Sequence, residues 1–499
     1  MLRWLNRMLP VRRPGAGRRP AAARLRLEAL EERTVLSTAP SILQTNLVSD
    51  LAGVAQVQDT NLVNPWGISE STGSPFWISD NNSGLSTLYN TAGTPQSLVV
   101  SIPTPDDPLG ASGAPTGTVF NINGGANGGF VLHGFDKNGN ATSGSAAFLF
   151  ATEDGTIVGW NPGVNPQGFD PNKAGTYGII AVDNSQNPTA DSGAVYKGLA
   201  IATDGTGRTL LYAANFRSGK VDVFDNGFNP VDLGAFSDPH LPAGYAPFNV
   251  QELNGKIYVT YAKQNADKHD DVAGAGNGFV DVFNLDGTPG LVGGKVRLVS
   301  HGNLDSPWGL AIAPSNFGKF ANALLVGNFG DGHIDAYNPL TGKFLGQLTG
   351  PDGDPIQIDG LWALKVGNGH SGGDTNKVYF TAGIDHEMHG LFGSLSVATA
   401  GSSNDLAEQQ ALQAAIDVAQ ISLQTVINDN SNGADATKLQ QDVQTLNTAL
   451  ADLVRAEQTF AADQSSDSGT PGGGASAPGR HHAADDVFAT DLGGMVPGL

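Results

Sequence analysis

The sequence predicts an all-β fold, a β-propeller with six blades, and three observations support this prediction. A unit of similar sequence recurs from residue 41 to residue 398. Each copy contains two apolar strands, a polar turn that ends in Gly, and a third strand that mostly ends in an aromatic residue followed by Asn or Asp. The chain holds 67 Gly and only 15% charged residues, which is typical of many short strands joined by tight turns. Because such a unit cannot bury its apolar face alone, we expect it to stack on its neighbours.

Two copies show the repeat most clearly. Asn64-Pro65-Trp66-Gly67-Ile68 opens the first, and Ser306-Pro307-Trp308-Gly309-Leu310 opens the fifth. The predicted third strands of the six copies end at Tyr89, Trp160, Phe224, Phe283, Tyr337 and Leu395. Successive endings are 54 to 71 residues apart, more than the roughly 40–50 residues of a short blade, so several loops are expected to be long.

Closure of the ring requires one strand from outside the last copy. Residues 41–48 have the composition of a strand before the first copy, whereas the last copy has no outer strand of its own. We therefore predict that the N-terminal strand completes the final blade and removes exposed edges.

The two ends of the chain differ from the repeats. Residues 1–40 are predicted to be a basic, disordered export segment without a long apolar run. Residues 402–461 show helical periodicity in two runs, which predicts a helical hairpin that either docks on the propeller or mediates self-association. Residues 462–499 are expected to be a disordered tail rich in Gly, Ser and Pro. No apolar run is long enough to predict a transmembrane segment.

Charge and cysteine content exclude several functions. Residues 1–37 hold nine Arg and three Glu, so the rest of the chain holds 18 of the 27 basic and 45 of the 48 acidic residues. An acidic body repels phosphate, which argues against a nucleic-acid partner. The absence of cysteine excludes disulfides, zinc–thiolate sites and thiol nucleophiles.

Propeller geometry predicts a functional rim. If the first strand of each blade is innermost, its start and the turn between the second and third strands lie at the same end of the central channel. Polar side chains at this rim suit a protein or carbohydrate ligand, or a Ca²⁺ ion; Asn and Asp are also common turn formers. The rim candidates are Asp80, Asn82, Glu153, Lys197, Asn215, Arg217, Asn328, Asp331 and Asp359.

The densest ionisable cluster lies at residues 384–390. Glu387 and His389 are candidates for an acid–base role, and Asp385 and Glu387 for a metal site; a surface turn is the alternative. Loop 263–276, which contains several ionisable residues, is either a lid, a partner-binding loop or a solvated loop. Trp66 and Trp308 are expected to pack between blades. Asp136 is expected in a hairpin turn.

Several of these motifs resemble a family of exported bacterial proteins, some of which carry a PEP-CTERM sorting tail. The resemblance rests on Asn64-Pro65-Trp66-Gly67-Ile68, Ser306-Pro307-Trp308-Gly309-Leu310 and Gly390-Leu391-Phe392-Gly393-Ser394-Leu395, among others. It implies an exported six-bladed propeller similar in layout to NHL-repeat proteins, and no site residue comes with it. Residues 25–37 resemble the LEPR-XLL export element, with Glu32 in place of the usual Pro. The helical C-terminus replaces the sorting tail.

Two functions follow as hypotheses. The first is an exported, non-catalytic module that binds a protein or glycan through the channel rim. The second is a hydrolase or lyase that uses Ca²⁺ or the Glu387 and His389 side chains at the channel mouth.

Overall fold

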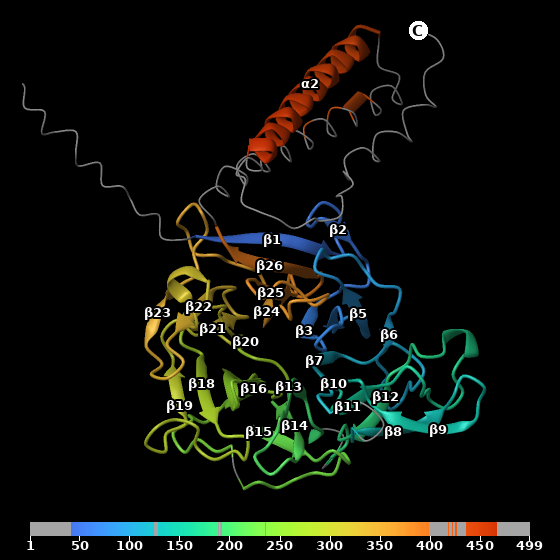
Figure 1. Cartoon of the computed structure of the whole chain (residues 1–499), viewed down its shortest axis with the longest axis vertical. Coiled ribbons are helices and arrows are strands. Elements are labelled where there is room, and N and C mark those ends of the chain that lie inside the picture. Colours follow the sequence, from blue (N-terminus) through green and yellow to red (C-terminus); the bar gives the residue numbers. More distant parts are fainter. Residues whose placement is uncertain are drawn as a thin grey trace, which may run out of the picture.

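The computed structural model describes residues 41–398, apart from 124–127, 188, 190–191 and 235, together with residues 418, 422, 425–426 and 436–466. Six sheets form a ring (Figure 1), and a seventh, two-stranded sheet is inserted in one of them. The first strand of each sheet contacts the first strand of the next around the whole ring. The predicted six-bladed propeller is therefore confirmed.

Blades 1 and 2 follow the predicted order of strands. Blade 1 contains β3 (Pro65–Ser69), β4 (Phe76–Asp80), β5 (Leu85–Tyr89) and β6 (Val100–Ser101). Blade 2 contains β7 (Pro115–Phe120), β10 (Phe148–Thr152), β11 (Thr156–Trp160) and β12 (Ile179–Asp183). The hairpin β8 (Val131–Phe135) and β9 (Ala141–Ser145) separates β7 from β10. Its turn holds Asp136, whose Oδ1 accepts the backbone N–H groups of Asn138 and Asn140, as expected for a hairpin turn.

Blades 3 to 5 continue the ring. Blade 3 has three strands, β13 (Tyr196–Thr203), β14 (Thr209–Asn215) and β15 (Lys220–Phe224). Blade 4 contains β16 (Tyr245–Leu253), β17 (Lys256–Lys263), β18 (Gly278–Phe283) and β19 (Arg297–Ser300). Blade 5 contains β20 (Pro307–Ile312), β21 (Leu324–Asn328), β22 (Ile334–Tyr337) and β23 (Phe344–Gln347). Two short 3-10 helices, Pro171–Lys173 and Gly318–Phe320, lie in the loops.

Blade 6 is completed by the N-terminal strand, as predicted. It contains β24 (Leu361–Val366), β25 (Val378–Ala382), β26 (Leu391–Val397) and β1 (Ile42–Ser49), and β2 (Val57–Gln58) extends it by pairing parallel to β1. β1 runs antiparallel to β26, with Ile42 opposite Val397 and Ser49 opposite Leu391. Strands from the two ends of the propeller sequence thus share one sheet, and the ring cannot open without breaking this ladder.

Glycines in the first strands allow the blades to approach closely at the axis. A Cβ atom on Gly67 would lie 2.5 Å from the carbonyl oxygen of Thr116 in the next blade. A Cβ atom on Gly309 would lie 2.5 Å from the carbonyl oxygen of Trp362. The Trp-Gly pairs of the sequence repeat therefore place a large side chain at the axis and, beside it, a residue without a side chain where the neighbouring strand passes.

The helix α2 (Ala436–Ser466) is the second run of the predicted helical hairpin, and it extends five residues past the predicted end at 461. Most of the first run, and the tail from residue 467, lie outside the described residues, as does the segment 1–40 that was predicted to direct export. Among the described residues, no helix combines the length and the apolar character that a bilayer crossing requires.

Candidate functional site

The predicted rim, where the starts of the first strands meet the turns after the second strands, is present at one end of the channel. Pro65 at the start of β3 pairs with Asp80 at the end of β4, and Pro307 at the start of β20 pairs with Asn328 at the end of β21. The start of each first strand and the turn after the second strand therefore lie at the same end of the channel. Side chains from these positions in different blades meet there.

Five aromatic side chains fill the channel beneath the rim, and we call them the axial aromatic cluster: Trp66, Phe248, Trp308, Phe329 and Trp362. Trp66 stacks on Trp362 with ring centroids 3.5 Å apart, and the edge of Trp308 meets Trp66 at 6.2 Å. Phe329 stacks on the other side, 4.0 Å from Trp362. Trp66 and Trp308 belong to blades 1 and 5, which are not neighbours. Both are buried and pack between blades, as expected, and they do so at the axis, where each contacts Trp362 of blade 6.

Lys197 is the centre of the rim. Its side chain is only 3% exposed, its Nζ contacts Oε1 of Glu153, and Asp270 Oδ1 lies 3.4 Å away. The ammonium group also lies 5.1 Å from the ring centroid of Trp66. Burial alone would lower the pKa of Lys197, but the neighbouring carboxylates, Glu153 first, outweigh burial and raise it. Lys197 is therefore held as a buried cation.

Glu387 reaches the same place from blade 6, on an unusual turn. Asp385, His386 and Glu387 have φ angles of 53°, 57° and 64°, three consecutive residues in the left-handed region. This conformation costs roughly 1–2 kcal/mol per residue and is often found at functional sites. The turn directs the Glu387 carboxylate to Asn64, whose Nδ2 donates to Oε2 at 2.8 Å. Burial, the largest cause, raises the pKa of Glu387.

A continuous chain of polar contacts joins these residues across four blades and the loop after β17. Asn82 Nδ2 donates to the backbone oxygen of Glu387 at 2.7 Å, and Asn81 Nδ2 donates to Glu153 Oε2 at 2.9 Å. Glu153 then contacts Lys197, which contacts Asp270. We call this set the rim network: Asn64, Asn81, Asn82, Glu153, Lys197, Asp270 and Glu387.

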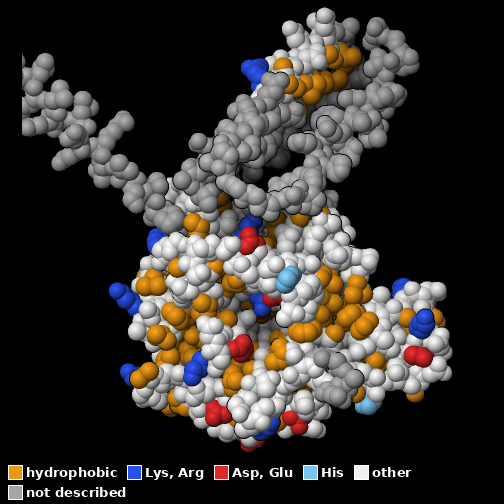
Figure 2. Space-filling view, in the orientation of Figure 1, with side chains coloured by type: hydrophobic (Ala, Val, Ile, Leu, Met, Phe, Trp, Pro, Cys, Tyr) orange, Lys and Arg blue, Asp and Glu red, His pale blue; other side chains and the backbone are white. Residues whose placement is uncertain are grey.

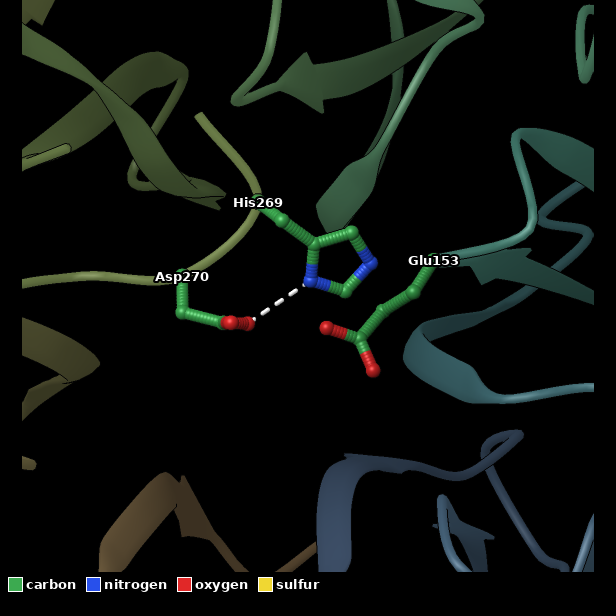
Figure 3. A group of neighbouring side chains, drawn as sticks. All are labelled: Glu153, His269 and Asp270. Carbon is green, nitrogen blue, oxygen red and sulfur yellow. Dashed lines mark hydrogen bonds and ion pairs between the residues drawn. The ribbon is translucent and has the colours of Figure 1, made fainter. Parts of the chain in front are cut away.

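The loop 263–276 brings His269 and Asp270 to the channel mouth. His269 Nδ1 lies 2.7 Å from Asp270 Oδ1, and both side chains point towards Glu153, which comes from blade 2 (Figure 3). The hydrogen bond from His269 is the main reason that the pKa of Asp270 falls to about 2. The loop therefore covers one side of the mouth and adds an ionised carboxylate to it.

Glu153, His269 and Asp270 offer ligand atoms that lie within 4.8 Å of one another, a geometry that can hold a metal ion. However, the Lys197 ammonium contacts both carboxylates. A metal ion would compete with this cation, and one of its ligands would be a nitrogen, which Ca²⁺ does not favour. The predicted metal candidates Asp385 and Glu387 are not part of this group.

Three of the predicted rim residues instead connect strands within their own blades. Asp80 Oδ2 accepts the backbone N–H of Thr87 at 3.1 Å. Asn215 Nδ2 donates to Asp222 at 2.8 Å, and Asn328 Nδ2 donates to Asp335 at 3.1 Å. In each case the last residue of the second strand is tied to the third strand, so these residues have a structural role.

The other predicted candidates lie apart from the rim network. Arg217 Nη1 donates to the backbone oxygen of Gly193 at 3.0 Å, Asp331 lies 3.2 Å from the His333 ring, and Asp359 accepts the N–H of Asp385 at 2.8 Å. His389 faces Asp50 at 2.7 Å and not Glu387. Glu387 and His389 therefore have separate partners and do not form an acid–base pair with each other.

Two further residues lie at the mouth or directly beneath it. Asp271 lies close enough to influence the pKa values of both Lys197 and Glu387, and its Oδ2 is buried without a hydrogen-bond partner in the described part of the chain. Trp362 occupies the position of Trp66 and Trp308 in blade 6. Its place can be read from the sequence, where Leu361-Trp362-Ala363 aligns with Pro65-Trp66-Gly67.

Comparison with other proteins identifies relatives of the chain. No protein-family model matches the chain. "Uncharacterized protein R648" of Acanthamoeba polyphaga mimivirus is 33% identical over 355 residues, which cover 70% of this chain and 78% of that protein. "Uncharacterized protein L690" of the same virus is 32% identical over 355 residues, which cover 70% of this chain and 84% of that protein.

The chain belongs to the family of these mimivirus proteins. Solved structures share its fold. An aldose sugar dehydrogenase of Streptomyces coelicolor aligns over 72% of this chain and 100% of its own, with 13% identity and a TM-score of 0.39. An α-L-arabinofuranosidase of Fusarium graminearum aligns over 71% of this chain and 98% of its own, with 10% identity and a TM-score of 0.38. These are similarities of fold alone.

Proposed function

We propose that the protein is a non-catalytic binding module whose channel rim recognises a basic side chain of a protein partner. The observation that carries the proposal is the excess of acid at the mouth: among the described residues, Glu153, Asp270, Asp271 and Glu387 surround Lys197. One ammonium group cannot balance four carboxylates. A lysine or arginine of a partner would supply the missing positive charge.

Access and preorganisation support this proposal. The side chain of Asp270 is 60% exposed and that of His269 is 37% exposed, so a ligand can reach the outer part of the mouth. Glu387 is held by Asn64 and by the left-handed turn, so little rotamer freedom is left to lose on binding. On the face of the molecule that Figure 2 shows, charged side chains of both signs are scattered.

The test compares short basic peptides with neutral glycans. We expect oligolysine and oligoarginine peptides to bind the intact protein, and Asp270→Asn to weaken binding several-fold, because it removes the most exposed carboxylate of the mouth. Asp352→Asn is the matched control, since Asp352 is exposed in a distant turn. Binding of glycans but not of the peptides would favour the glycan hypothesis and overturn this one.

The affinity for a basic peptide is also expected to depend on pH. Burial raises the pKa of both Glu387 and Asp271 in the free protein. A bound cation favours the ionised forms, so binding takes place together with loss of protons from these groups. The affinity should therefore fall as the pH is lowered through the acidic range, and an affinity independent of pH would contradict the proposal.

A second candidate function is a hydrolase or lyase with its site at the same mouth. It is favoured by the contrast between Glu387, whose pKa is raised, and Asp270, whose pKa is lowered to about 2. Carboxyls with separated pKa values can act as acid and base. Turnover of an ester, lactone or polysaccharide that Glu387→Gln abolishes would support catalysis; the absence of turnover across such a panel would oppose it.

Export and metal content are parts of the proposal that need their own measurements. The basic segment at residues 1–40 and the motifs shared with exported bacterial propellers motivate an extracellular or cell-surface location. Fractionation of cells that produce the full chain tests this. Elemental analysis of the purified protein tests for Ca²⁺ or another metal, with loss of a stoichiometric ion to a chelator as the positive result.

A further inference from the structure

The opposite end of the channel contains a cavity that is separate from the rim. It has a volume of about 180 Å³ and is lined by the first strands of all six blades. Its wall residues come from the later parts of these strands, such as Ser69, Thr118, Gln251 and Lys365, whereas the rim is formed by the strand starts. Since a water molecule takes about 30 Å³ in the liquid, the cavity has room for a small organic molecule. We call it the far cavity.

The axial aromatic cluster separates the two ends of the channel. Trp66, Trp308 and Trp362 are each no more than 3% exposed and lie in contact with one another across the axis. Trp308 also forms part of the wall of the far cavity. A ligand in the far cavity would therefore contact the underside of the cluster and would not reach Lys197 or Glu387.

The far cavity has its own polar groups, among them the carboxylates of Glu70 and Glu252 and the ammonium group of Lys365. Glu70 Oε1 lies 3.2 Å from Lys365 Nζ, and the Glu70 side chain is only 8% exposed. The other carboxylate oxygen of Glu70, Oε2, is buried and has no hydrogen-bond partner in the described part of the chain. The hydroxyl groups of Ser69 and Thr118 lie 3.0 Å apart in the same wall. The wall thus presents donors and acceptors of hydrogen bonds beside apolar strand residues, a composition that is typical of small-molecule sites.

We propose that the far cavity binds a small neutral polyol, of monosaccharide size or smaller, independently of the rim. A hydroxyl group of the ligand would donate to the unpartnered oxygen of Glu70, and Lys365 would donate to a ligand oxygen. An anionic ligand is disfavoured because the wall holds the two carboxylates of Glu70 and Glu252 against the ammonium group of Lys365, so an added negative charge would remain uncompensated in a buried setting. Apolar ligands are disfavoured because they would leave the polar wall unpaired.

The experiment uses the full chain and free small molecules as probes. Saturation-transfer NMR is recorded with D-glucose, D-galactose, L-arabinose and glycerol, and with glucosamine and gluconate as charged counterparts. Tryptophan fluorescence is followed in parallel, since Trp308 lines the cavity. We expect at least one neutral polyol to bind, and gluconate, the anionic counterpart, to bind less well.

Two variants test the location. Glu70→Leu with Lys365→Met removes the polar pair without leaving an unpaired charge, and we expect the affinity to fall about tenfold or more. Ala200→Leu fills the cavity from a buried wall position and keeps the polar pair, which separates loss of space from loss of hydrogen bonds. Circular dichroism of both variants establishes that they are folded.

Glu387→Gln is the control that separates this site from the rim. We expect it to leave polyol binding unchanged, whatever it does to peptide binding at the rim. The proposal is overturned if no neutral polyol in the panel binds, if gluconate binds as tightly, or if binding survives in both folded cavity variants. Binding that Glu387→Gln alone abolishes would also overturn it, because the ligand would then be at the rim.

Discussion

The indole N–H of Trp362 donates a hydrogen bond to Oδ1 of Asn64, 3.0 Å away, and so joins the last blade to the first. Nδ2 of the same Asn64 donates to Glu387 Oε2. One amide therefore connects the axial aromatic cluster below the rim with the rim network above it. Asn64 has a φ of 49°, and Ser306, which precedes the proline of the corresponding motif in blade 5, has a φ of 46°. The repeat thus preserves an unusual backbone conformation that directs these side chains to the mouth.

Two substitutions of Trp362 should lower the free energy of unfolding by different amounts. Trp362→Phe keeps an aromatic ring at the axis but leaves the buried Oδ1 of Asn64 without its donor, which should cost about 1–3 kcal/mol of unfolding free energy. Trp362→Ala also leaves a cavity and should cost about 3–5 kcal/mol. Urea unfolding measures both changes. If the Phe variant were as stable as the parent protein, the bond to Asn64 would contribute nothing to stability.

Lys197 is expected to be essential for stability because it is the buried cation of an acidic mouth. Lys197→Met would leave Glu153, Asp270 and neighbouring carboxylates facing one another without compensation. Loss of one partner of a buried pair costs about 3–5 kcal/mol. The double variant Lys197→Met, Glu153→Gln removes the closest of these carboxylates and should recover part of the loss. Thermal unfolding of the three proteins tests this, and a double variant less stable than Lys197→Met would show that the charge argument is wrong.

Asp335 should make stability depend on pH in a predictable direction. Burial raises its pKa from 3.8 to about 6 in the folded state. Between these two values the folded protein binds a proton that the unfolded chain does not, so this group makes stability fall as the pH rises from 3.8 to 6. The full effect of such a shift is roughly 3 kcal/mol, at about 1.4 kcal/mol per pKa unit.

The Asp335→Asn variant isolates this contribution. Its free energy of unfolding should change less between pH 4 and pH 7 than that of the parent protein, because the titrating group is gone. Asp352→Asn removes an exposed carboxylate and serves as the control, for which we expect the parental pH profile. An unchanged pH profile in Asp335→Asn would show that Asp335 titrates alike in the folded and unfolded states.

Much of the fold could be predicted from the sequence because the information is local and repeated. The third strands ending at Tyr89, Phe224 and Tyr337 follow from alternation and from Gly in the preceding turn. The place of β1 in blade 6 follows from a missing strand at one end and a spare strand at the other. This argument requires only that the last blade gain the outer strand that its own repeat lacks.

The site was harder to predict because it depends on which side chains meet across the axis. Asp80 and Asn328 end the second strands of blades 1 and 5, and both form hydrogen bonds within their own blades. Glu153, which follows the second strand of blade 2, instead points to the channel and contacts Lys197. The direction of the Glu387 side chain depends on a left-handed turn, and no glycine at residues 385–387 indicates such a turn in the sequence. The far cavity depends on the distance between the first strands, which no periodicity in the sequence encodes.

The left-handed turn at residues 385–387 offers a direct measure of the strain at the rim. His386 is exposed and has a φ of 57°, so its side chain contributes little packing while its backbone is in a conformation that favours glycine. His386→Gly should relieve about 1–2 kcal/mol of strain but lose roughly 0.5–1 kcal/mol through the greater freedom of the unfolded chain. The variant should therefore be slightly more stable than the parent protein. His386→Ala should not be stabilised, since alanine keeps the strain. If urea unfolding showed the Gly and Ala variants to be equally stable, the turn would store no strain at this residue, and the presentation of Glu387 would have to be attributed to its contacts with Asn64 and Asn82.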